Sequence, residues 1–94
     1  MYTVVRRYTG AGPLAMAMVE RRRDVEDVFR DVPGFRAYYA LLTNDGTVAT
    51  ITVCDDQAGT AESTRRAAAW IQKNLAGVSV SAVEITEGDV FVSF

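Results

Sequence analysis

The sequence predicts an α+β domain of ferredoxin-like topology, with strands and helices in the order β-α-β-β-α-β. Three observations support this: two amphipathic helical stretches, a hairpin turn at Asn44-Asp45-Gly46 between two strand-like segments, and further strand-like segments near both ends. Because crossover connections are right-handed, this order places four strands in one antiparallel sheet with both helices on one face. A chain of 94 residues accommodates one such domain, which we predict over 1–94.

The first strand is predicted over 2–9, where aromatic and β-branched residues dominate. A Gly-Ala-Gly-Pro stretch ends it, and Pro13 suits the first turn of a helix. A single amphipathic helix is predicted over 14–32, because apolar residues recur there mostly three or four positions apart. They are Leu14, Met18, Val25, Val28, Phe29 and Val32. Pro33-Gly34 then ends the helix.

The second and third strands are predicted over 35–43 and 47–54, joined by the hairpin turn, in which Gly46 readily accepts a positive φ. Asp55 and Asp56 follow, and their carboxylates suit the N-terminus of a helix.

The buried stripe of the second helix is predicted to comprise Ala61, Thr64, Ala68, Ile71 and Leu75. Gly77 is its predicted C-cap. The last strand is predicted over 80–94, with a bulge or tight turn at Glu87-Gly88-Asp89.

Composition excludes several classes of function. The chain has no histidine, which removes the usual general base near neutral pH and the commonest ligand of zinc and haem. We therefore expect no metal and no cofactor. A net charge of −2 argues against neutralising nucleic-acid phosphates, and the third strand lacks the basic and aromatic pattern of RNA-binding sheets. A single cysteine, charges within 1–9 and no stretch of about 20 apolar residues predict a cytoplasmic protein without membrane contact.

The second strand is apolar on both faces, since Tyr39 and Leu41 alternate with Tyr38 and Leu42. A sheet that is apolar on both faces is normally covered on both. Two helices cover only one face, so we expect a second copy of the chain to cover the other, giving a homodimer.

Four segments carry a resemblance to a known family: 32–35 (Val-Pro-Gly-Phe), 48–53 with the following Asp55-Asp56, 63–75 around Trp70, and 87–90 (Glu-Gly-Asp-Val). Through them the whole chain resembles the dimeric α/β-barrel superfamily and, within it, the antibiotic-biosynthesis-monooxygenase-like (ABM-like) proteins. The resemblance implies two sheets that face each other in a homodimer, and a cavity between each sheet and its own helices or loops.

Members of that family include cofactor-independent monooxygenases that act on polycyclic aromatic substrates, and haem-degrading enzymes. Both groups use an Asn on the first strand and a Trp on the second helix, and the haem enzymes add a histidine. Trp70 matches the Trp, whereas the first strand offers Arg6 and Arg7 but no Asn. The resemblance implies a cofactor-independent monooxygenase for a small aromatic substrate. The missing Asn and the absent histidine favour the alternative, a non-catalytic barrel that binds a small ligand or serves in a stress response.

Arg6 and Arg7 are the first candidate binding residues, because they lie on opposite faces of a strand and one must point inward. An inward arginine can hold an anionic ligand, and it can equally pair with an interior carboxylate such as Glu84.

Trp70, Tyr38 and Thr50 are the remaining candidates for a ligand site. Trp70 can line a pocket or fill the core. Tyr38 can donate a proton to a reacting oxygen or simply pack in the sheet, and Thr50 can give a cavity a polar floor or suit a strand on propensity alone.

Overall fold

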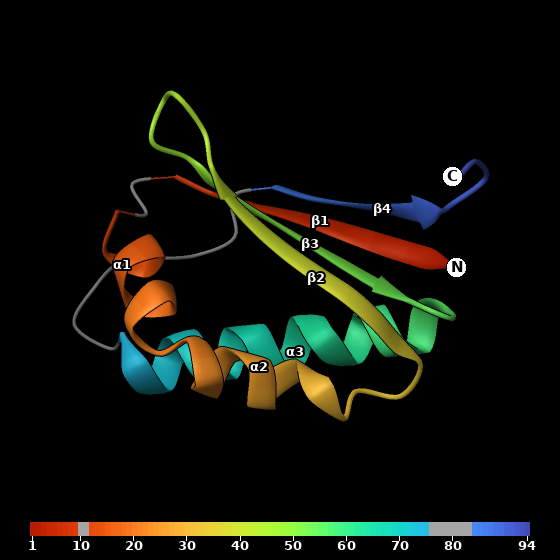
Figure 1. Ribbon diagram of the computed structural model, residues 1–94, viewed down its shortest axis with the longest axis horizontal. Coiled ribbons are helices and arrows are strands. Elements are labelled where there is room, and N and C mark those ends of the chain that lie inside the picture. The colour runs from red at the N-terminus through yellow and green to blue at the C-terminus, as the bar shows by residue number, and fades with distance from the viewer. Residues whose placement is uncertain (10–11, 76–83) are drawn as a thin grey trace.

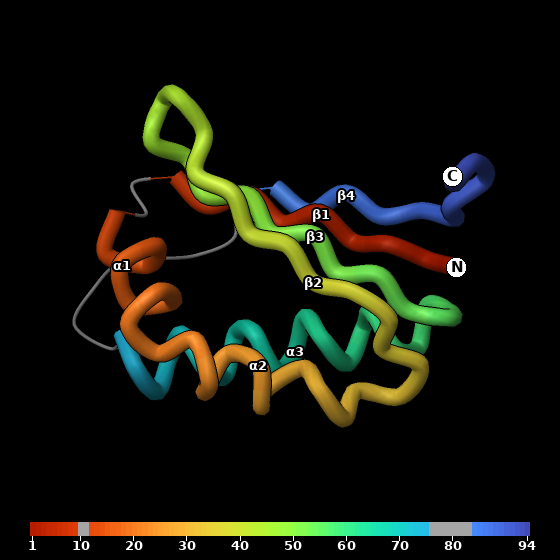
Figure 2. The backbone as a smooth tube through the Cα atoms, in the orientation of Figure 1, coloured from red at the N-terminus to blue at the C-terminus, as the bar shows by residue number. Residues whose placement is uncertain are grey.

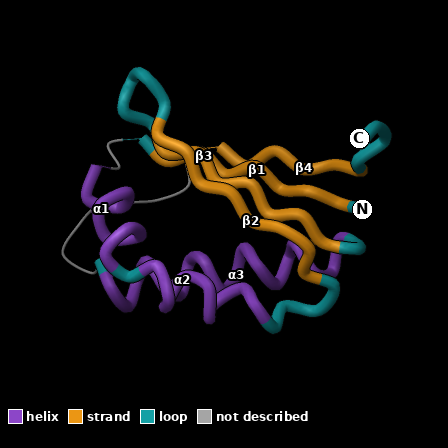
Figure 3. The backbone as a smooth tube through the Cα atoms, viewed as in Figure 1, coloured by secondary structure: helices purple, strands orange, loops and turns teal. Residues whose placement is uncertain are grey.

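The computed structural model describes residues 1–9, 12–75 and 84–94, and confirms the α+β ferredoxin-like fold (Figure 1). Its elements are β1 (Tyr2–Tyr8), α1 (Gly12–Glu20), α2 (Arg22–Arg30), β2 (Phe35–Leu42), β3 (Val48–Cys54), α3 (Gln57–Asn74) and β4 (Glu84–Asp89). The sheet order is β2-β3-β1-β4, and every neighbouring pair is antiparallel. The helices of the described ranges all lie on one face of this sheet (Figure 3). None of them combines the length and hydropathy needed to span a bilayer.

The hairpin between β2 and β3 forms as the sequence predicts and projects beyond the sheet (Figure 2). Gly46 has φ +83°, and its N–H donates to the Thr43 carbonyl at 3.1 Å. This turn fixes the register in which Tyr38 lies opposite Thr52, and so brings the helix-facing side chains of the two strands together.

The first helical stretch is two helices, not the single one that its periodicity predicts. The chain leaves the α conformation at Arg21, with φ −115° and ψ 38°, and α2 continues in a different direction (Figure 1). The two halves bury their side chains in separate clusters: Leu14 packs with Tyr8 and Val48, and Phe29 packs with Val32 and Cys54. The break falls in the charged run between them, which has no apolar side chain to bury.

The helix α3 is capped as predicted, since the Asp56 carboxylate accepts from the Gly59 N–H at 3.2 Å. Its predicted buried stripe is wrong at Ala61 and Ala68, which are exposed, whereas Thr64, Ile71 and Leu75 are partly buried, and the last two pack against the core. The fully buried residues of the helix are Gly59, Thr60, Ser63 and Ala67. Two of these are polar, so hydropathy alone misses them.

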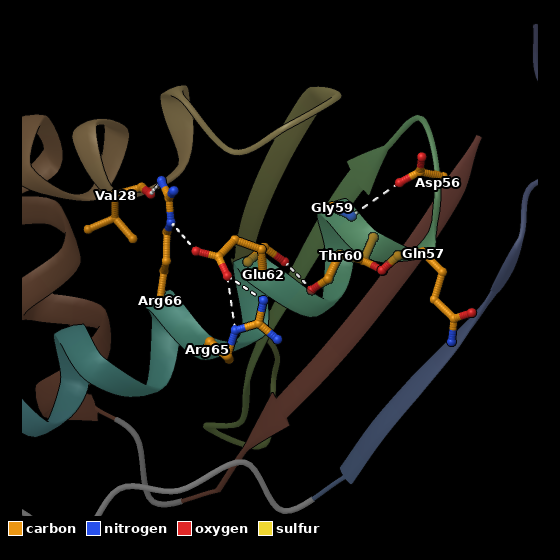
Figure 4. Close-up of polar contacts among 9 residues, drawn as sticks. Val28, Asp56, Gln57, Gly59, Thr60, Glu62, Arg65 and Arg66 are labelled. Atoms are coloured by element: carbon orange, nitrogen blue, oxygen red, sulfur yellow. Dashed lines mark hydrogen bonds and ion pairs between the residues drawn. The ribbon is translucent and has the colours of Figure 1, made fainter.

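A cluster of charged side chains joins α3 to the end of α2 (Figure 4). Arg66 donates to Glu62 at 2.9 Å and to the Val28 carbonyl at 3.1 Å, and it also pairs with Asp31. Its guanidinium holds the pKa of the Asp31 carboxyl below its usual range. These contacts fasten α2, which forms one wall of the site described below, to the longest helix.

The last strand is shorter than predicted and regular. Glu87, Gly88 and Asp89 pair with Val4, Thr3 and Tyr2 along β1, so the predicted bulge at these residues is wrong. Regular pairing is favoured because, without β4, the backbone N–H and C=O groups along this edge of β1 would have no partners. Residues 90–94 lie beyond β4, while Gly77 and 80–83 fall outside the described residues.

The sheet face opposite the helices has an apolar patch on β1, β2 and β3, and it also carries the charged residues Arg7 and Glu84 on β1 and β4. The patch comprises Val5, Ile51, Tyr39 and Leu41, of which Tyr39 is 62% exposed and Leu41 45% exposed. In the described part of the chain no helix lies over this face (Figure 3).

Candidate functional site

The candidate site is built around Arg6, whose side chain points from the middle of β1 toward the helices and is 1% exposed. Its guanidinium donates four hydrogen bonds to hydroxyl groups on two elements. From β3, Thr50 accepts from Nε at 3.3 Å and Thr52 accepts from Nη2 at 2.7 Å. From α3, Thr64 and Ser63 accept from Nη1 at 2.8 and 3.3 Å.

All four partners of Arg6 are neutral. Within the described ranges no carboxylate comes within 4.0 Å of the guanidinium. The predicted pairing with Glu84 is wrong, because Glu84 is exposed and lies opposite Arg7 in the sheet. The Phe29 ring, 6.0 Å from the guanidinium carbon, offers partial compensation through its π face. Arg6 is therefore a buried positive charge without a counter-ion in the described structure.

A small cavity lies directly beside this charge. Its volume is about 20 Å³, enough for a single water molecule. Tyr8, Tyr38, Thr50 and Trp70 line it, together with apolar side chains of all three helices. Thr50 connects the cavity to Arg6, because its hydroxyl accepts from Nε and the residue forms part of the cavity wall.

The two tyrosines of this cavity are neutral at physiological pH. Burial raises the pKa of Tyr38 to about 12, against the lowering effect of the nearby Arg6 charge. Burial also raises the pKa of Tyr8, again opposed by Arg6. Both hydroxyls can therefore donate a hydrogen bond to a group in the cavity.

A much larger groove of about 910 Å³ runs between β2 and the helices α1 and α2. Its walls are apolar except for Arg22, Glu26 and Arg30 on α2 and the tyrosines of β2. The groove and the small cavity share four wall residues, which are Met18, Val25, Phe29 and Tyr38. Phe29 and Tyr38 stack with ring centroids 4.5 Å apart and planes 20° from parallel, so one aromatic pair contributes to both walls.

The structure brings four of the five sequence-predicted site residues together. Trp70, Tyr38 and Thr50 line the small cavity, and Arg6 lies behind Thr50. Arg7 does not join them, because it is exposed on the opposite face of β1. Whether these residues bind a ligand stays a prediction.

Sequence reasoning missed the hydroxyls of α3 and the groove. The signal for the hydroxyls is present, since Thr60, Ser63 and Thr64 recur at helical spacing on the side that faces an inward arginine. The groove depends on the break at Arg21, which a continuous helical periodicity conceals.

No protein-family model matches the sequence, and no curated protein matches it. Solved structures do. The haem degrader MhuD from Mycobacterium tuberculosis, crystallised with two haems in its active site, is 20% identical with a TM-score of 0.69, covering 100% of this chain and 99% of that one. SnoaB, a cofactor-independent oxygenase from Streptomyces nogalater, is 18% identical with a TM-score of 0.67, covering 98% and 94%. A candidate antibiotic biosynthesis monooxygenase from Deinococcus radiodurans is 13% identical with a TM-score of 0.67, covering 100% and 96%. The chain thus has the ABM-like fold.

The residues of this chain do not fit haem, the ligand bound in the MhuD structure. Protein ligands of haem iron are histidine, cysteine thiolate, methionine beside histidine, or tyrosine. The chain has no histidine, and Cys54 is fully buried. The raised pKa of Tyr38 disfavours the phenolate that would bind iron. Within the described ranges no three metal-ligating side chains gather either.

Proposed function

We propose that this protein binds a small, flat aromatic compound in the groove between β2, α1 and α2, and oxidises it as a cofactor-independent monooxygenase. The observation that carries the proposal is the apolar groove of about 910 Å³, which shares four wall residues with a small cavity whose lining residue Thr50 is bonded to the buried Arg6. A volume of this size suits a ligand of several fused rings.

The groove walls suit an aromatic body. Phe29 and Tyr38 offer a stacked pair of rings on one side, and Met18 gives an adaptable thioether on the other. The charged residues of α2 that reach the groove are partly neutralised by one another, since Glu26 pairs with both Arg22 and Arg30. Ring contacts and water exclusion, not surface charge, therefore supply the affinity.

The chemistry needs little from the protein beyond confinement and proton handling. A ring methylene conjugated with the carbonyl across the ring loses a proton to a water molecule at the mouth of the groove, and the resulting carbanion passes electrons to O₂. One oxygen atom becomes a ring carbonyl, and the other leaves as water with the two methylene hydrogens. The groove holds the reacting ring in place and excludes solvent. The neutral hydroxyls of Tyr8 and Tyr38 can donate a hydrogen bond to the substrate oxygen on which negative charge develops.

We also propose that the protein forms a homodimer through the open face of its sheet. The apolar face formed by Val5, Ile51, Tyr39 and Leu41 suits a second copy of the same face, because a two-fold interface buries the patch on both subunits. Phe91 and Val92, which are 94% and 58% exposed, extend the apolar surface beyond β4.

Anthrone, a tricyclic ketone with an activated methylene, is the probe that tests this function. We expect it to quench the fluorescence of Trp70, the only tryptophan, and to be oxidised with uptake of one O₂ per molecule above the rate without protein. Ala40→Phe narrows the groove and should weaken binding and oxidation at least tenfold, while Ala61→Phe on the exposed side of α3 serves as the matched control. Binding without O₂ uptake would refute the monooxygenase and leave the non-catalytic ligand-binding alternative. Absence of binding would refute both.

A further inference from the structure

We propose that Arg6 makes the small cavity a binding site for the ionised oxygen of a ring hydroxyl, so that the protein selects acidic phenols and enols. The inference rests on the proposed function, because the ring itself must lie in the groove. It adds a charge requirement that an apolar groove alone does not impose.

Arg6 has no counter-ion within the described ranges. Arg6 is 1% exposed, and its four partners are uncharged hydroxyls. Burying a charge is unfavourable, and neutral hydrogen bonds offset only part of the lost hydration. A ligand that brings one negative charge into the cavity supplies the missing compensation at close range, where solvent screens it weakly.

Thr50 connects the Arg6 guanidinium to the cavity. The Thr50 hydroxyl accepts from Arg6 Nε at 3.3 Å, and Thr50 is one of the residues that line the cavity. A hydroxyl that accepts from a cation becomes a better donor, because hydrogen bonds in a chain polarise one another. Tyr8 and Tyr38 line the cavity together with Thr50, so three side chains that carry neutral hydroxyl groups surround it, and Arg6 lies behind one of them. That is the composition of an oxyanion site.

The volume of the cavity limits which charged group can enter it. A cavity of about 20 Å³ admits one oxygen atom, whereas a carboxylate needs room for two oxygens and the carbon between them. The oxygen of a ring in the groove has to cross only the shared wall, which consists of Met18, Val25, Phe29 and Tyr38. Rotation of Tyr38 or Phe29 away from their stack opens this wall. The site therefore fits a ring oxygen better than an aromatic acid.

A matched pair of fluorescent probes separates this inference from the proposed function. 7-Hydroxycoumarin ionises near neutral pH with a change in absorbance, and 7-methoxycoumarin has the same ring without an ionisable group. With saturating protein, we expect the bound hydroxycoumarin to ionise at least one pH unit below the free probe. By linkage, its phenolate then binds at least tenfold more tightly than its phenol.

Two arginine variants assign the effect. Arg6→Gln should abolish the shift in ionisation, and Arg7→Gln should leave it intact, because Arg7 lies on the opposite face of the sheet. Circular dichroism checks the fold of each variant, and the wild-type comparison of the two probes decides the matter even if Arg6→Gln does not fold. If methoxycoumarin binds but the bound and free hydroxycoumarin ionise at the same pH, the inference is wrong and the proposed function stands. If Arg7→Gln loses the ionisation shift as fully as Arg6→Gln does, the inference is also wrong. If neither probe binds, both proposals fall.

Discussion

The substitution Thr52→Val tests whether the buried hydroxyls hold the Arg6 charge. Thr52 is 0% exposed, and its Oγ1 accepts the shortest of the four bonds from the guanidinium, at 2.7 Å. Valine keeps the shape of the side chain but cannot accept. The variant thus leaves one N–H of a fully buried cation without its partner and opens no large cavity.

The expected cost follows from the kind of bond that is lost. A hydrogen bond to a charged group contributes about 1.5–3 kcal/mol, so Thr52→Val should lower the free energy of unfolding by about 2 kcal/mol. For a domain of this size that corresponds to a fall of about 8–16 °C in melting temperature. The control is Thr86→Val on β4, whose side chain is exposed, with an expected change within about 0.5 kcal/mol.

Urea unfolding followed by Trp70 fluorescence measures both variants, at one fixed protein concentration because dimerisation would add to the apparent stability. A Thr52→Val variant as stable as the Thr86→Val control would refute the reasoning. It would mean that the guanidinium does not depend on these hydroxyls, and the charge argument for an anionic ligand would lose its basis.

Two further substitutions test the packing of α3 and the open sheet face. Gly59→Ala should lower the free energy of unfolding in urea by about 1–3 kcal/mol, because the added Cβ would lie 2.5 Å from the Pro33 carbonyl oxygen. The control Gly12→Ala has open space around the added Cβ and should leave the stability unchanged. Equal stability of the two variants would contradict the close approach at Gly59. Ile51→Glu on the open face should halve the mass measured by light scattering from about twice 10.3 kDa, while the exposed Ala61→Glu should leave it unchanged. A wild-type protein that already runs as a monomer would refute the dimer.

The fold could be predicted because local chemistry and periodicity agree at its decisive points. The Asn44-Asp45-Gly46 turn, the Asp56 cap and the alternation of β3 each follow from short-range rules, and the structure has all three. The alternation of β1 was also enough to place one of two neighbouring arginines inside.

The candidate site is harder to predict because it breaks the hydrophobic pattern. Thr60 and Ser63 are buried on α3, where a hydropathy rule places the stripe along Ala61 and Ala68 instead. Ser63 takes part because Arg6, far away in sequence, needs acceptors. A hydropathy rule does not select polar tertiary partners of this kind, and the continuous helical periodicity conceals the break at Arg21 that shapes the groove.

The central claim is that the groove holds the ring and the small cavity holds its ionised oxygen. A crystal structure of the complex with 7-hydroxycoumarin at a pH above the probe's ionisation tests it most directly. The account predicts the ring between β2 and α2 beside Phe29, with its oxygen within hydrogen-bond distance of the Thr50 hydroxyl. A probe bound on the open sheet face, or in the groove with its oxygen turned toward solvent, would contradict it.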